Sequence, residues 1–141
     1  MISQLTVFLE NEKGRLASAC RTIADAGLNM SALFVADTAD FGVARIFCDR
    51  PQAAAEALKA AGYRATTTEV LAVRVPNRPG GLADLLEFLN SHDVNIEYGY
   101  CFLAGEENAV DVLKVSDPSV EALLADAGFE SLAPEDIYAV D

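Results

Sequence analysis

The sequence predicts an α+β protein made of two copies of one βαββαβ unit, each an antiparallel sheet with both helices on one face. Landmark residues recur along the chain at a nearly constant offset. Each half also shows the same order of short apolar runs and helical stripes. The 141 residues are 52% hydrophobic, which suits one ordinary domain or two very small ones with a buried core.

The repeat is defined by residues that return 66 positions later in the chain. The recurring pairs are Asn11 and Asn77, Gly14 and Gly80, Leu16 and Leu82, Asn29 and Asn95, and Gly62 and Gly128. The offset is 67 at Pro51 and Pro118, so one residue is gained in the middle of the unit and lost again later, as expected for loops. A repeat of this kind predicts two units, residues 1–69 and 70–141.

The elements of each unit follow from periodicity. Apolar and β-branched runs predict strands over 4–9, 29–36, 42–48 and 64–69, and over 70–75, 95–103, 109–115 and 136–140. Apolar stripes of helical period predict helices over 14–26, 51–61, 80–91 and 118–127. Pro51 and Pro118 suit a first helical turn, and polar turns are expected at 37–40 and 105–108. This order is that of a ferredoxin-like unit.

Charge and cysteine content exclude several classes of protein. The net charge is −12, and residues 71–141 carry 3 Lys and Arg against 14 Asp and Glu. An acidic surface repels nucleic acid and anionic membranes, and no apolar run is long enough to span a bilayer. The three cysteines are scattered, which predicts no zinc site and reduced thiols in a cytoplasmic protein. We expect no cofactor.

The turn from first strand to first helix is the candidate binding element. Glycine lets the backbone approach a ligand, and a helix N-terminus offers unpaired amides and a partial positive charge that suit a carboxylate. Asn77 can donate or accept hydrogen bonds. Each motif Asn is followed 18 residues later by Asn29 or Asn95. Both features also have a structural interpretation, as turn chemistry and as caps inherited by both repeats.

The sequence Asn-Arg-Pro-Gly-x-Leu, a leucine-striped helix and then Val-Asn-Ile resembles the ACT domain, which occurs in amino-acid-regulated enzymes. The likeness covers nearly the whole chain, twice. The second repeat follows the pattern more closely, because the first departs from it at Glu12 and Lys13. The resemblance implies a βαββαβ fold and an amino acid bound at the seam between two domains.

In such a seam, one domain supplies the strand–helix loop and its partner supplies the start of the second strand. The loop residues implied by the resemblance are Asn11, Gly14, Arg15 and Leu16, or Asn77, Pro79, Gly80, Gly81 and Leu82. The implied strand residues are Asn29 and Met30, or Asn95 and Ile96. In serine-responsive members of the family the two Asn positions contact the ligand from opposite domains.

The sequence therefore predicts a regulatory sensor that binds a free amino acid, and two other functions compete with this prediction. An enzyme would need a nucleophile–base pair, a carboxylate pair or a metal cluster, and the single histidine, His92, stands at a helix end. We therefore expect no catalytic residues. The alternative is a regulatory subunit or interaction module of a separate amino-acid biosynthetic enzyme, similar to the small subunit of acetolactate synthase. A homodimer is expected, because each small sheet leaves an edge to cover.

Overall fold

The computed structural model describes residues 1–37 and 40–141. The described chain forms two compact units. The first unit is Ser3–Thr68 together with Pro134–Asp141, and the second is Met1–Ile2 together with Glu69–Ala133. Two elements run through both units: β1 (Ile2–Glu10) and β4 (Arg64–Pro76). The predicted boundary between repeats, at residues 69 and 70, falls within the long strand β4, and the division into two domains at this point stays a prediction.

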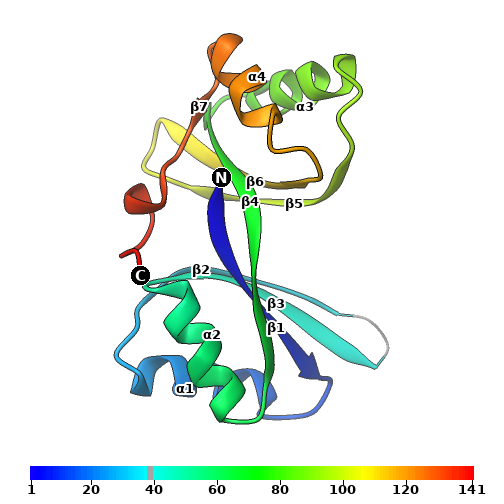
Figure 1. The fold of residues 1–141 in the computed structure, drawn as a ribbon. Coiled ribbons are helices and arrows are strands. Elements are labelled where there is room, and N and C mark those ends of the chain that lie inside the picture. Colours follow the sequence, from blue (N-terminus) through cyan, green and yellow to red (C-terminus); the bar gives the residue numbers. More distant parts are fainter. Residues whose placement is uncertain (38–39) are drawn as a thin grey trace. The chain divides into compact units, whose positions relative to one another are not determined.

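In the first unit the strands lie in the order β2-β3-β1-β4. β2 (Met30–Asp37) and β1 both pair antiparallel with β3 (Phe41–Cys48), so that Ile46 stands opposite Leu5 on one side and Leu33 on the other. Helices α1 (Arg15–Asp25) and α2 (Pro51–Ala60) lie on one face of this sheet (Figure 1). Alternate residues of β1 enter a core with Ile23 and Leu58 from the helices.

The second unit repeats this arrangement with the strand order β5-β6-β4, and β7 (Glu130–Ser131) pairs with β4. β6 (Asn108–Val115) pairs antiparallel with both β4 and β5 (Ile96–Leu103). Helices α3 (Gly81–Ser91) and α4 (Val120–Asp126) cover one face (Figure 1). Leu71, Val73, Leu85 and Leu89 are fully buried in its core. The predicted α+β class with two βαββαβ repeats is confirmed.

Two details of the second repeat were predicted wrongly. No strand forms over 136–140; Pro134–Asp136 is a short 3₁₀ helix, and the two residues of β7 pair with β4 instead. The tail after it packs in the first unit, where the ring of Tyr138 stacks on Phe47 and the amide of Arg50 donates to the carbonyl of Ala139. Helix α4 also begins after Pro118, because Ser119 donates its amide to the Asp117 carboxylate in a turn.

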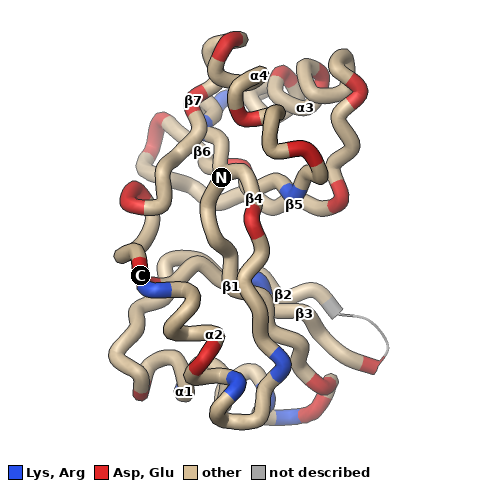
Figure 2. Tube along the Cα trace, viewed as in Figure 1, with Lys and Arg blue, Asp and Glu red and all other residues tan. Residues whose placement is uncertain are grey.

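The other predicted elements are present with small shifts at their ends. Pro51 is the first residue of α2, as expected. The turn predicted at 37–40 includes residues 38 and 39, which lie outside the described residues. The second unit holds 3 Lys and Arg against 12 Asp and Glu, and Figure 2 shows acidic residues on both of its helices.

Candidate functional site

The β1–α1 turn of the first unit brings several predicted residues together. Gly14, immediately before α1, has a φ of 88°, a left-handed conformation that suits glycine, and its carbonyl accepts the amide of Ser18. Asn11, Arg15 and Leu16 line a cavity of about 130 Å³ together with residues of β1, β2 and β3. Three of the four predicted loop residues therefore face one small cavity beside the helix N-terminus.

Arg15 contributes the positive charge at this end of the unit. Its guanidinium lies 4.7 Å from the centre of the Tyr63 ring, and its Nε atom is buried without a hydrogen-bond partner among the described residues. It also lines a larger cavity of about 430 Å³ with Arg64, Phe8, Phe41 and Tyr63. Two guanidinium groups among aromatic rings can hold an anionic group of a ligand that also has an apolar part. The carboxylate of Glu10 borders the same cavity.

The matching turn of the second unit is more closely packed. Gly80 also has a φ of 88°, and a Cβ atom on Gly81 would stand 2.3 Å from the carbonyl oxygen of Pro76, so that only glycine fits there. Arg78 donates to the Asp84 carboxylate at 3.1 Å and to the carbonyl of Pro79 at 3.1 Å. These contacts hold the loop against the first turn of α3.

Asn77 has a structural role that could not be predicted from the sequence. Its side-chain amide donates to the carbonyl of Glu106 at 3.1 Å, and its backbone amide donates to the carbonyl of Glu107 at 2.8 Å. Asn77 therefore joins the β4–α3 loop to the β5–β6 turn. A ligand could use the remaining side-chain oxygen of Asn77, which is an acceptor.

The second set of predicted residues lies at the opposite end of each unit. Asn29 and Asn95 directly precede β2 and β5, and the chain reaches them only after α1 or α3. Each of these helices has 11 residues, about 16 Å of helix. Because β2 and β5 run parallel to the first strand of their own unit, their starts lie away from its loop. Asn11 and Asn29 of the first unit, like Asn77 and Asn95 of the second, therefore lie at opposite ends of their own unit.

The strand-start residues have different surroundings. The carbonyl of Asn29 accepts the amide of Asp49 at 2.9 Å, and Met30 packs against the first core. Asn95 borders a cavity of about 260 Å³ with Asp117. Ile96 lines a different cavity of about 270 Å³ that it shares with Leu82 of the predicted loop. The structure thus brings these two predicted residues of the second unit together.

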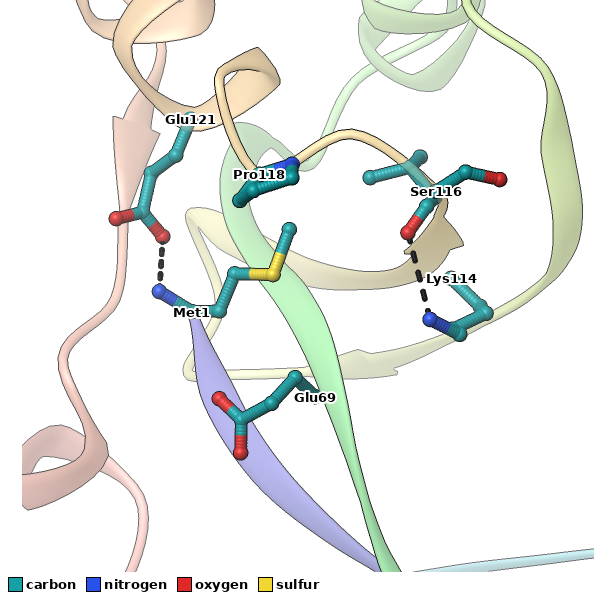
Figure 3. A pocket seen from close by; sticks show the side chains of 7 residues that line it. Met1, Glu69, Lys114, Ser116, Pro118 and Glu121 are labelled. Atoms are coloured by element: carbon teal, nitrogen blue, oxygen red, sulfur yellow. Dashed lines mark hydrogen bonds and ion pairs between the residues drawn. The ribbon is translucent and has the colours of Figure 1, made fainter.

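Another cavity of the second unit, of about 430 Å³, was not predicted (Figure 3). Met1, Glu69, Lys114 and Glu121 border it. The amino group of Met1 pairs with the Glu121 carboxylate, and Lys114 donates to the carbonyl of Val115. The residues come from distant segments without a shared motif, so no local sequence signal could have identified the cavity.

His92 and Cys48, two residue types that often serve in catalysis, have structural surroundings in this fold. The Nδ1 atom of His92 lies 3.0 Å from both the Phe88 carbonyl and the Ser91 hydroxyl at the end of α3. Burial, with the nearby Asp49 and Asp141 charges, raises the pKa of the Cys48 thiol to about 12, which keeps it protonated and poorly nucleophilic. In the described part of the chain, no three His, Cys, Asp or Glu side chains are grouped to hold a metal ion.

The helices of the described chain are all too short or too polar to cross a membrane.

A family model described as an ACT domain pair matches residues 1–129. The chain belongs to this family. An ACT domain pair is a regulatory module of the amino-acid-sensing type. The match spans both units of the fold, which agrees with the two copies of the loop motif.

Solved structures show the same fold. This ACT domain pair is similar to protein BT0572 from Bacteroides thetaiotaomicron, with 36% identity, a TM-score of 0.90, and coverage of 96% of this chain and 94% of that one. It is also similar to the ligand-free regulatory subunit of aspartate kinase from Thermus thermophilus, with 18% identity, a TM-score of 0.67 and 89% of each chain covered. For the regulatory subunit from Thermus flavus, the identity is 18%, the TM-score 0.62 and the coverage 89% and 86%.

At 18% identity the likeness to the two aspartate kinase subunits shows the fold alone. No curated protein is significantly similar to the chain in sequence.

Proposed function

We propose that this ACT domain pair is a non-catalytic sensor that binds a free amino acid. The observation that carries the proposal is the cavity at the N-terminus of α1, where Asn11, Arg15 and Leu16 converge. The first amides of a helix lack acceptors inside the helix and attract a carboxylate. The Arg15 guanidinium adds a positive charge, and the Asn11 side chain adds a donor and an acceptor.

The binding site is completed by another ACT domain. Within one unit the two Asn positions are separated by a whole helix, so a site that uses both of them needs a second domain. That domain supplies Asn29 and Met30, or Asn95 and Ile96. The loop of the second unit offers the helix amides and the side-chain oxygen of Asn77, with Pro79, Gly80, Gly81 and Leu82 beside them. An amino acid bound in this way shifts the quaternary state only through a different affinity for each state.

We further propose that the chain forms a homodimer. β2 is the edge strand of the first sheet, and Leu33, Phe34 and Val35 on it are 45%, 40% and 41% exposed. An edge strand with exposed apolar side chains is a natural surface for pairing with another copy.

A thermal-shift screen of the purified protein against the twenty amino acids tests the sensor function. A ligand at 100 times its dissociation constant stabilises the folded state by about 2.7 kcal/mol, which raises the melting temperature by several degrees. We expect one amino acid to act, and Asn11→Ala to reduce its effect while Asn90→Ala, an exposed Asn on α3, leaves it unchanged. The absence of any shift with all twenty would contradict the proposal.

A second candidate function is that of a regulatory subunit or interaction module for a separate amino-acid biosynthetic enzyme. The exposed apolar side chains of β2 favour it, because they offer a surface to a partner protein as well as to another copy. The aspartate kinase regulatory subunits, which share the fold, suggest the type of enzyme to try. Light scattering separates the alternatives: a stable dimer alone in solution favours the free-standing sensor, and a monomer favours the partner-dependent subunit.

A further inference from the structure

The cavity shared by Leu82 and Ile96 lies in the second unit, between α3 and the strands β5 and β6. Its volume is about 270 Å³, the space of roughly nine water molecules. Leu82 and Leu86 form its helix side, and Ile96, Gly99 and Leu113 form much of its strand side. Leu82 belongs to the first turn of α3, so the cavity begins next to the amides at the helix N-terminus.

One acidic residue lies in this apolar lining. Asp111, on β6, is 1% exposed. It stands opposite Val73 of β4 and Cys101 of β5 in the sheet. Apart from the neighbouring Cys101 thiol, a weak donor, neither carboxylate oxygen has a hydrogen-bond partner among the described residues. Burying a carboxylate in this way is unfavourable unless a partner compensates the lost water.

The fold itself does not require this carboxylate. In the first unit the equivalent cross-strand pair is Val35 and Ala44, which lie 66 and 67 residues before Cys101 and Asp111. An apolar pair therefore serves the same place in the repeat. Asp111 is a specific feature of the second unit, and its missing partner calls for a functional reason.

The Asp111 carboxyl and the Cys101 thiol both have a raised pKa, with burial as the main cause. Burial raises the pKa of Asp111, and the hydrogen bond from the Cys101 thiol opposes this only in part. Burial, and then the hydrogen bond and charge of Asp111, raise the pKa of the Cys101 thiol to about 12, so the thiol remains neutral. Among the described residues, no Lys or Arg lines the cavity beside the carboxylate, and the side chains that α3 contributes are Leu82 and Leu86.

We propose that this cavity holds the ammonium group and the apolar side chain of an amino acid, with the Asp111 carboxylate as acceptor for the ammonium. This inference rests on the proposed sensor function and names the chemistry of one of its sites. Leu82, Leu86 and Ile96 contact the apolar side chain, and the start of α3 receives the carboxylate of the ligand. The exposed Cys101 side chain turns to another rotamer to admit the ammonium.

The test uses a probe that contains only the ammonium and the apolar chain, 3-methylbutylamine, and its neutral analogue 3-methylbutan-1-ol. Two-dimensional amide NMR of the whole protein follows each titration. The amine should shift the amide signals of Leu82, Leu86, Gly99 and Cys101 in a saturable way. The alcohol should bind at least tenfold more weakly. Asp111→Asn should reduce the affinity for the amine by at least tenfold, and the matched control Glu87→Gln, an exposed carboxylate on α3, should leave it unchanged.

The outcomes separate this inference from the sensor function. Equal binding of amine and alcohol, or unchanged amine binding by Asp111→Asn, overturns the inference even if an amino acid binds elsewhere. Saturable amine binding that depends on Asp111, in a protein that binds none of the twenty amino acids, supports the subsite and overturns the sensor function. Asp111→Ala, which carries the residue of the first unit, is the second variant and should behave as Asp111→Asn does.

Discussion

One carboxylate oxygen of Asp141 accepts a hydrogen bond from the backbone amide of Gln52 at 2.9 Å, and the other oxygen accepts one from the amide of Ala53 at 3.0 Å. Helix α2 has no cap from its own N-cap residue, Arg50, so a residue from the far end of the sequence fills that role. A carboxylate at this place satisfies two unpaired amides and also meets the positive end of the helix dipole.

Replacing Asp141 by Ala is predicted to lower the free energy of unfolding by about 1 kcal/mol, because α2 loses its cap. Urea denaturation followed by circular dichroism measures the change. Glu135→Ala removes an exposed carboxylate from the same tail and should leave the midpoint unchanged. Equal midpoints for Asp141→Ala and the unchanged protein would show that the tail does not stabilise α2.

Replacing Asp111 by Asn is predicted to stabilise the protein near neutral pH, by about 1 to 3 kcal/mol, because an uncompensated buried charge is removed. The pKa of Asp111 lies above its ordinary value of 3.8 in the folded state. The folded protein then holds the proton more tightly than the unfolded chain does, so the stability contributed by this group falls as the pH rises from about 4.

Urea denaturation between pH 4 and 7 checks this. The stabilising effect of Asp111→Asn should grow with pH across that range and be small at the acidic end. The Cys101 thiol, the titratable neighbour of Asp111 across the strand pair, does not ionise there, since its pKa is about 12. A constant difference between the two proteins at all pH values would contradict the prediction.

Replacing Arg15 by Gln is predicted to weaken binding of the amino acid found in the thermal-shift screen by at least tenfold, because the guanidinium of Arg15 attracts the carboxylate of the ligand in the first unit. The substitution removes the charge that faces both cavities of the β1–α1 end. Isothermal titration calorimetry measures the affinity. Arg21→Gln, on the exposed side of the same helix with 75% of its side chain accessible, is the control and should bind normally.

Replacing Val35 by Lys is predicted to convert the proposed dimer to a monomer, because a charge on the apolar edge strand β2 opposes pairing with another copy. Size-exclusion chromatography with light scattering gives the mass. Ala17→Lys places the same charge on an exposed position of α1 and should leave the mass unchanged. If Val35→Lys and the unchanged protein have the same mass, β2 is not the dimer surface.

The sequence by itself determined the class of the fold, the two repeats and the position of nearly every helix and strand. These features follow from local periodicity and from glycine at positions such as Gly14 and Gly80, where the backbone conformation favours that residue. Because the repeat allowed each element to be read twice, few elements were misplaced; they are the start of α4, which follows Pro118, and the final tail.

Tertiary structure decided where the tail lies, what Asn77 contacts and which residue stands next to Asp111. The sequence of residues 136–140 has some strand character, but in the structure Tyr138 stacks on Phe47, a contact that no local pattern predicts. Asp111 and Cys101 are ten residues apart in the chain and meet only through the register of β5 and β6. Cross-strand neighbours and cavities depend on how distant segments pack, and a single sequence does not encode that packing in any local pattern.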